Sequence, residues 1–193
     1  GNLFIVEQGS GRIRKVEAAT GIITTVAGGG IGDPLRKIFG DGGPATEALV
    51  KLPDDVAVDK EGNLYIATDN RIRKVDAATG IISTIAGTGE RGLEGDGGPA
   101  IEAGLAEPVS VAVDSQGNLL IADRDNHRVR RVDAGTGIMT TVAGIGKHAA
   151  RRPGAYQGMR TVTEQRLGLD PIPINVLSAA EGSGYSGDGG PAM

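Results

Sequence analysis

The chain has 193 residues and a formal net charge of −4; it is 39% hydrophobic, only 3% aromatic, and contains no cysteine. The negative balance offers no broad basic surface for nucleic acid or an anionic membrane, and the lack of cysteine excludes disulfides and thiolate metal sites. No apolar run approaches the ~18 residues that span a bilayer. Thirty-three glycines and nine prolines predict short apolar segments separated by frequent turns.

One unit occurs three times along the chain. It begins with Gly-Asn-Leu at Gly1, Gly62 and Gly117, continues through a basic run such as Arg-Ile-Arg-Lys-Val, and closes on Val-Ala-Gly or Ile-Ala-Gly. A self-similar unit of this length is typical of a repeat architecture. We therefore interpret residues 1–193 as a single domain with repeats at about 1–61, 62–116 and 117–193.

Each repeat divides into short β-like runs, which we name a to d. In the second repeat they are residues 56–59, 63–68, 71–76 and 81–86. Run b is apolar on both of its alternating faces, which predicts a strand covered by packed sheet on both sides. Four antiparallel strands joined in this order make one blade, and such blades stack into a β-propeller because no blade buries both faces alone. The predicted fold class is all-β.

The turns between the runs indicate which loops share a face. Residues 59–63 and 114–118 join run a to run b, and residues 76–80 and 133–137 join run c to run d. Each begins with Asp and carries a late Gly, the chemistry of a tight turn. These turns should lie on one face, nearly unchanged between repeats. The b–c loops and d–a linkers should lie on the other face, and their variation there favours a recognition role.

The linker motif Gly-Asp-Gly-Gly-Pro-Ala also occurs three times, with Asp41, Asp96 and Asp188 at its second position. We interpret it as structural, since glycines permit a sharp reversal and proline fixes the entry to the next run a. No cofactor is evident, but calcium is a possible one, with these aspartates as its ligands. However, one carboxylate per loop falls short of the six or more oxygens that this ion takes.

Run c carries much of the positive charge of the chain. We expect a solvated outer strand whose arginine and lysine stems cover apolar surface while their charged heads stay in water. An RNA-binding stripe is the alternative, against which stand the net charge and the scarcity of aromatic residues. The residues concerned are Arg12, Arg14, Lys15, Arg71, Arg73, Lys74, Arg128, Arg130 and Arg131.

The chain does not contain enough runs for a closed ring. Only two run a segments are present, beginning at Val56 and Val111. We therefore expect eleven clear strands in about three blades, forming an incomplete ring that further blades or self-assembly would complete. Residues at about 147–184 match no run and are expected to be an insertion that ends in a degenerate strand at 174–179. A decayed blade is the alternative.

The recurring series GNLYIA, RIRKVD, TGIISTIAG, GDGGPATEA and LPDDVAVD resembles the NHL repeat family, in the glycine-rich form common in bacterial multi-repeat proteins. The resemblance implies a β-propeller, often of six blades, that acts as a binding scaffold. It also favours an extracellular or periplasmic location. Enzymes of neighbouring propeller families include metal-dependent lactonases and lyases, and some animal relatives bind RNA.

The candidate ligand site lies at the start of run a on the variable face. Pro53-Asp54-Asp55 in the second repeat is replaced by Pro108-Val109-Ser110 in the third, so the scaffold itself does not require the two carboxylates. The cluster around His127 could coordinate a metal or act as a base, or could instead be a polar loop that caps itself. The candidate residues are Asp54, Asp55, Ser110, Asp123, Asp125, Asn126, His127, Arg151 and Arg152.

These candidate residues place both acidic and basic side chains on the variable face. This mixture favours a non-enzymatic scaffold for a polar ligand or a protein partner. The first alternative is a metal-dependent hydrolase or lyase of the propeller lactonase type. An RNA-binding propeller is the second.

Overall fold

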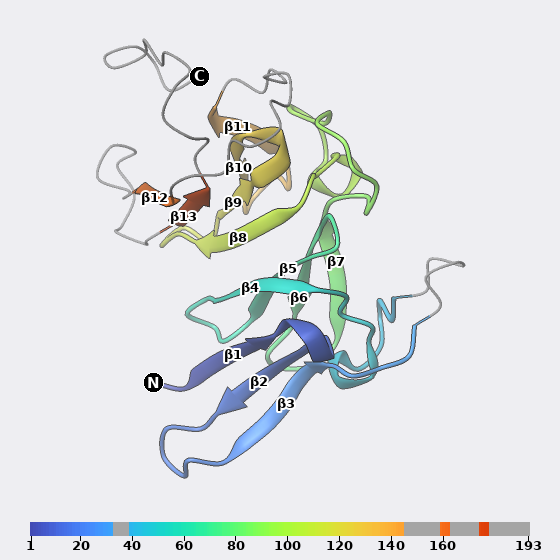
Figure 1. Ribbon diagram of the computed structural model, residues 1–193, viewed down its shortest axis with the longest axis vertical. Coiled ribbons are helices and arrows are strands. Elements are labelled where there is room, and N and C mark those ends of the chain that lie inside the picture. Colours follow the sequence, from blue (N-terminus) through green and yellow to red (C-terminus); the bar gives the residue numbers. More distant parts are fainter. Residues whose placement is uncertain (33–38, 145–158, 163–173, 178–193) are drawn as a thin grey trace.

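The computed structural model describes residues 1–32, 39–144, 159–162 and 174–177. Within them the regular structure is β-strand with single turns of 3-10 helix, as the repeats predict. The strands form antiparallel sheets of three, four and four strands, one per repeat, which we call blades 1, 2 and 3 (Figure 1). Blade 1 holds β1 (Leu3–Glu7), β2 (Arg12–Val16) and β3 (Ile23–Gly28); blade 2 holds β4 (Pro53–Val58), β5 (Leu64–Thr68), β6 (Arg71–Val75) and β7 (Ile82–Ala86); blade 3 holds β8 (Pro108–Val113), β9 (Leu119–Asp123), β10 (Arg128–Val132) and β11 (Met139–Ala143).

The tight turns form as the sequence predicts. In the a–b turn of blade 2, Asp59 Oδ1 accepts a 2.8 Å hydrogen bond from the backbone N–H of Asn63, and Gly62 has a φ of 89°. In the c–d turn, Asp76 Oδ1 accepts from the backbone N–H of Thr79 at 2.9 Å. The aspartate satisfies the turn backbone, and the glycine adopts a left-handed conformation that other residues resist.

Run b lies at the centre of the packing, as expected. All five residues of β5 are buried. Leu64 and Ile66 belong to a core cluster shared with blade 1, whereas Tyr65 and Ala67 belong to a cluster shared with blade 3. Alternate residues of one strand thus fill two separate cores, because successive side chains point to opposite faces. Each fully buried large apolar side chain contributes about 1.5–3 kcal/mol.

The expectation that the run c cations stay in water is wrong for the central arginine of blades 2 and 3. Arg73 and Arg130 are 1% and 0% exposed. Arg73 Nη2 donates to Asp41 Oδ1 at 2.6 Å, and Arg130 Nε donates to Asp96 Oδ1 at 3.0 Å. A guanidinium tolerates this burial because the linker supplies an aspartate and backbone carbonyls that satisfy its fork of donors.

These aspartates belong to two equivalent linker turns, residues 40–45 and 95–100. Each linker turn runs along the outer strand of the blade that follows it in the chain and exchanges two backbone hydrogen bonds with the start of that strand. The prediction that the linkers lie on the variable face therefore holds only for their ends, since their middle parts follow the outer edge. The bonds join Gly42 N to Ile82 O at 2.8 Å, Ile82 N to Gly43 O at 3.0 Å, Gly97 N to Met139 O at 2.8 Å and Met139 N to Gly98 O at 3.0 Å.

The predicted insertion lies largely outside the described residues. Two short strands within it, β12 (Met159–Val162) and β13 (Ile174–Leu177), pair antiparallel as a separate two-stranded sheet. The expected degenerate strand is therefore present, but it pairs with β12 and takes no place in a four-stranded blade. Across the described ranges, no helix has the length and apolarity needed to cross a membrane.

Candidate functional site

The b–c loops and the residues just before β4 and β8 meet on one face, which we call the variable-loop face. The loops are residues 8–11, 69–70 and 124–127. The Glu107 backbone N–H donates to Asn70 Oδ1 at 2.9 Å, and the Arg124 N–H donates to the Glu107 carbonyl at 3.3 Å. Loops of neighbouring blades are thus joined directly at this face. The opposite face, which carries the a–b and c–d turns, is the turn face.

Backbone strain separates the two faces. On the turn face, the positive-φ residues within the described part of the chain are all glycines, whereas on the variable-loop face several are not. A left-handed conformation costs a non-glycine residue roughly 1–2 kcal/mol. Such outliers gather at functional loops when the surrounding structure holds them in place. The residues are Leu52, Asp69, Asn70, Glu107 and His127, with φ of 46°, 41°, 57°, 51° and 53°.

The adjacent carboxylates of β4 reach opposite neighbours because the strand is irregular there. The register of β4 against β5 shifts between Pro53 and Asp55, as at a bulge. Asp54 accepts from Gln8 Nε2 of blade 1 at 2.9 Å. Burial raises the pKa of Asp54, against the opposing effects of the Arg124 charge and the Gln8 hydrogen bond. Asp54 is therefore an exposed carboxylate between Gln8 of blade 1 and the positive charge of Arg124 in blade 3.

Asp55 is occupied by a structural role. Its Oδ2 accepts from Ser110 Oγ at 2.7 Å and from the Val111 backbone N–H at 3.0 Å, both in β8 of blade 3. Ser110 is itself buried. These bonds join the two inner strands, so Asp55 and Ser110 fasten blade 2 to blade 3. Asp55 and Ser110 hold the same position in the second and third repeats. Because the residue type differs there, a carboxylate acceptor in blade 2 faces a hydroxyl donor in blade 3.

Asp123 and Asn126 are also used internally. Asp123 is fully buried and accepts from the Ala106 backbone N–H and from Asn126 Nδ2, each at 2.8 Å, and pairs with Arg130 at 3.4 Å. Burial raises the pKa of Asp123, and these hydrogen bonds and the Arg130 charge oppose the rise. The pair holds the b–c loop of blade 3 and offers little to a ligand.

Asp125 lies in a charged network that includes residues which the sequence analysis missed. Arg91 Nη1 pairs with Glu107 at 2.8 Å, and Arg124 Nε pairs with Asp125 at 3.1 Å. Arg91 also contacts Asp125, and Arg124 also contacts Glu107. The linker residues Arg91 and Glu107 carry no local motif. The one available signal was their position in a linker that varies between repeats.

His127 ends the loop helix in a left-handed conformation, and its side chain is exposed. Its imidazole has no hydrogen bond to another described residue. Arg151 and Arg152 lie outside the described residues, so their predicted role stays a prediction. In the part of the chain that the structure describes, no three His, Asp or Glu side chains gather closely enough to hold a metal ion.

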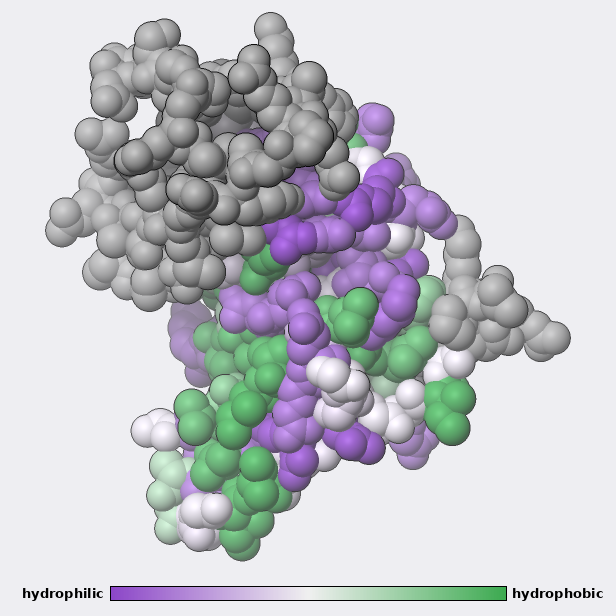
Figure 2. Space-filling model, in the orientation of Figure 1, coloured by the Kyte–Doolittle hydropathy of each residue, from purple (hydrophilic) through white to green (hydrophobic). Residues whose placement is uncertain are grey.

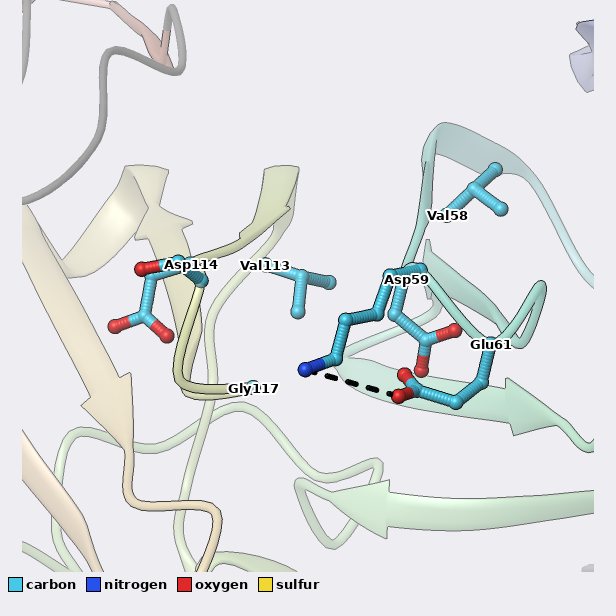
Figure 3. A pocket seen from close by; sticks show the side chains of 8 residues that line it. Val58, Asp59, Glu61, Val113, Asp114 and Gly117 are labelled. Carbon is cyan, nitrogen blue, oxygen red and sulfur yellow. Dashed lines mark ion pairs between the residues drawn. The ribbon is translucent and has the colours of Figure 1, made fainter. Parts of the chain in front are cut away.

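Two hollows lie between blades 2 and 3. The larger, of about 380 Å³, follows the inner strands from Asp55 and Ser110 to Val58 and Val113. The other, of about 220 Å³, opens on the turn face beside Lys60, which pairs with Glu61 at 3.9 Å (Figure 3).

The acids around this second hollow have little capacity left for a ligand. Asp59 is bound to Asn63 and Tyr65, and Asp114 is bound to Asn118. Burial and the Asp59 hydrogen bond raise the pKa of Tyr65 to about 12. The variable-loop face therefore remains the candidate site.

Comparison with known proteins agrees with the repeat pattern. The family model described as Teneurin NHL domain matches residues 33–94, and the model described as NHL repeat matches residues 105–132. Human NHL repeat-containing protein 2 is 30% identical over 146 residues, which cover 72% of this chain and 20% of that protein. Zebrafish Teneurin-3 is 41% identical over 100 residues, 47% of this chain and 4% of that protein. The chain spans a fifth or less of these relatives.

Among solved structures, an auxiliary nutrient binding protein from Bacteroides thetaiotaomicron has a TM-score of 0.52 at 16% identity, covering 75% of this chain and 33% of that chain. A streptogramin B lyase has a TM-score of 0.48 at 17% identity, covering 80% and 41%. The first likeness is one of fold alone and agrees with an all-β propeller. The relatives named above are animal proteins and do not support the expected bacterial form. The three repeats, the blades of three, four and four strands and these two matching models together show that the chain contains NHL-type repeats.

Proposed function

We propose that the chain is a non-enzymatic binding scaffold that recognises a polar ligand, best matched by a peptide segment with charges of both signs, on its variable-loop face. The observation that carries this proposal is the position of Asp54. It is an exposed carboxylate that accepts a hydrogen bond from Gln8 of blade 1 and lies within the influence of the Arg124 charge, and the neighbouring repeat has Val109 in its place. A group that the scaffold does not require, held at the meeting point of three blades, is what a recognition site needs.

The charged network beside Asp54 supports a polar ligand. Arg91 and Glu107 are about half and two-fifths exposed, with side-chain exposures of 49% and 38%. Exposed ion pairs contribute little to folding, typically about 0–1 kcal/mol, so their partners can be exchanged for ligand groups at low cost. A peptide that presents a carboxylate to Arg91 or Arg124 and a cation to Asp54 would match the charges of this face.

The side chains with acid–base chemistry favour binding over catalysis. Asp55 and Asp123 are saturated by internal hydrogen bonds. The His127 imidazole has no described partner to orient it, and a general base is normally held by a third group. The metal-dependent alternative thus has no candidate ligand set in the described ranges.

The central arginines of run c in blades 2 and 3 are not available to bind RNA, which weakens the RNA-binding alternative. Arg73 and Arg130 are buried against linker aspartates. They cannot reach a phosphate without leaving those partners, whereas phosphate contacts supply most of the affinity of such surfaces.

A pair of double variants tests the proposal. A fluorescent library of short peptides that mix Lys or Arg with Asp or Glu would be titrated into the full chain, together with an RNA oligonucleotide and a simple lactone. Asp54→Ala with Arg124→Ala should weaken binding of any selected peptide about tenfold or more, as expected for lost charge-assisted contacts.

Lys60→Ala with Glu61→Ala is the matched control, because it removes one charge of each sign on the turn face. It should leave the affinity unchanged. Equal weakening by both double variants, or a selected peptide whose affinity neither changes, would contradict the proposal. Hydrolysis of the lactone, or preferential binding of the RNA, would favour the corresponding alternative.

A further inference from the structure

A buried proline at the start of β4 separates two exposed side chains. Leu52 is 56% exposed, Pro53 is buried and Asp54 is exposed. This alternation indicates that Leu52 and Asp54 point to the same side of the chain, away from the core. Two residues of chain span at most about 7 Å, so an apolar and an acidic side chain lie next to each other on the variable-loop face.

Blade 3 has the same arrangement with the two residue types in reverse order. Glu107 and Val109 flank the buried proline that begins β8. Both are used within the chain, since Glu107 pairs with Arg91 at 2.8 Å and Val109 packs against a buried core cluster of its own blade. Leu52 belongs to no core cluster of the described residues. The pair in blade 2 is therefore the one that is open to a ligand.

The backbone at Leu52 makes leucine an unfavourable choice. Leu52 has a φ of 46°, and Glu107 has the same left-handed conformation with a φ of 51°. This conformation is costly for most residues with a Cβ atom, and the residue before a proline is further biased towards extended conformations. Asparagine adopts it more readily. Glu107 gains an ion pair with Arg91 in this conformation, whereas the packing of the described residues gives Leu52 no such return.

The same position is also open where it follows a four-stranded blade. The side chain of Glu107, which follows blade 2 in the chain, is 38% exposed. The exposure of Leu52 is thus a property of its position on the variable-loop face. Figure 2 shows apolar and hydrophilic side chains side by side over blades 1 and 2. A surface of this mixed kind suits a ligand that carries both apolar and charged groups.

We propose that Leu52 determines the specificity of the variable-loop face, by contacting an apolar side chain of the peptide that lies two residues away from the lysine or arginine bound by Asp54. This inference rests on the function proposed above and names the class of peptide. An extended peptide places the side chains of residues two apart on one side, about 7 Å from each other, which matches the spacing of Leu52 and Asp54. Leu52 thereby gains the apolar contact that the fold of the described residues does not give it.

The arginines of the charged network complete the motif. Arg124 acts on the carboxylate of Asp54 through its charge, and it shares its acidic partners with Arg91. A carboxylate of the peptide that binds these arginines lies on the far side of Asp54 from Leu52. The preferred ligand therefore carries an apolar, a basic and an acidic residue in this order, read in one direction of its chain or the other.

Labelled peptides chosen from the library described above test this inference on the full chain. One series places a leucine one, two or three positions away from the lysine, and a matched series has serine in place of the leucine. The peptide with the two-residue spacing should bind most tightly, about tenfold more tightly than its serine counterpart, because it buries an apolar side chain against Leu52.

Leu52→Asn removes the apolar side chain and suits the left-handed backbone. It should weaken binding of the leucine peptide about tenfold, leave the serine peptide unaffected, and keep or raise the midpoint of thermal unfolding. Leu52→Glu introduces the residue that the third repeat carries here, and it should shift the preference from leucine to lysine. Ile81→Asn is the control, because Ile81 is 41% exposed on the turn face, and it should not change the affinity.

The outcomes separate this inference from the proposed function. Equal affinity of the leucine peptide for the unmodified chain and for Leu52→Asn would overturn the inference, and so would a lower midpoint of unfolding, which would assign Leu52 to packing within the chain. Loss of binding in the Asp54→Ala, Arg124→Ala variant would still support the proposed function in either case. If no peptide of the library binds, both proposals are wrong.

Discussion

Blade 1 and blade 2 carry nearly the same sequence but bury it very differently. Leu3 is 59% exposed and its counterpart Leu64 is 4% exposed, while Ile23 and Ile82 are 46% and 0% exposed. In blade 2, β4 pairs alongside Leu64 and the linker turn covers Ile82. The same side chains are therefore core or surface according to segments that come from outside the repeat. A blade of this type is completed by its neighbours, and its stability is shared with them.

The central arginine should show the largest difference between the blades. Arg130→Ala leaves Asp123 buried without its cation, and we expect a loss of about 3–5 kcal/mol in the free energy of unfolding. Arg14→Ala removes only a partly exposed pair with Glu7 and should cost about 1 kcal/mol or less. Urea unfolding followed by circular dichroism would measure both. Equal losses would mean that burial of this arginine against acidic partners does not set its contribution to stability.

The first residue of strand d should show the next difference. Ile82→Ala opens a cavity beneath the linker turn and should destabilise the chain by about 2–5 kcal/mol. Ile23→Ala lies at an exposed edge and should change stability by about 0.5 kcal/mol. The two midpoints of thermal unfolding, measured at low protein concentration, give the comparison. A large effect at Ile23 in the dilute chain would show that this edge is already covered.

The threonine that binds the linker aspartate gives a smaller contrast. Thr84→Val removes the hydrogen bond to Asp41 and should cost about 0.5–1.5 kcal/mol. Thr25→Val removes no such bond within the described residues, so its effect should be close to zero. The pair is matched in sequence and in position within the blade. If Thr25→Val lowers the free energy of unfolding as much as Thr84→Val does, the hydrogen bond to Asp41 is not the source of the contrast.

The sequence predicts those parts of this structure that depend on local chemistry. The turn aspartates Asp59 and Asp76, and the two-sided burial of β5, follow from the turn motif and from alternation along one strand. The partner of Arg73 does not follow from it, because Asp41 is far away in the chain and meets Arg73 only when the linker lies along the outer strand.

The candidate site could be located by face but not by residue. Asp55 has the composition expected of a ligand-binding carboxylate, yet the packing of β4 against β8 gives it to Ser110. Arg91 and Glu107 show the reverse case. They carry no motif, and only the meeting of two loops makes them part of a network. Contacts between blades decide these roles, and a single strand or turn contains no record of them.

The smallest expected effect concerns the c–d turn. The Thr79 side-chain and backbone hydrogen bonds hold the pKa of Asp76 below its usual value. The stability that this carboxylate contributes is therefore present above its unfolded pKa of about 3.9 and is lost as the pH falls through the lower folded value.

In blade 1 the corresponding residue is Glu17, whose side chain pairs with Lys15 at 3.6 Å. Thr79→Ala should raise the pKa of Asp76 and reduce its contribution. An NMR titration of the Asp76 carboxyl carbon measures this change, and an unchanged pKa would assign the shift to another cause.

Amide hydrogen exchange at the first residue of strand d tests most directly whether the linker turns set the difference between the blades. The N–H groups of Ile82 and Met139 donate to Gly43 and Gly98, both at 3.0 Å. In the dilute chain, these two amides should exchange slowly and the Ile23 amide rapidly. Equal protection of all three amides in the dilute chain would contradict the account.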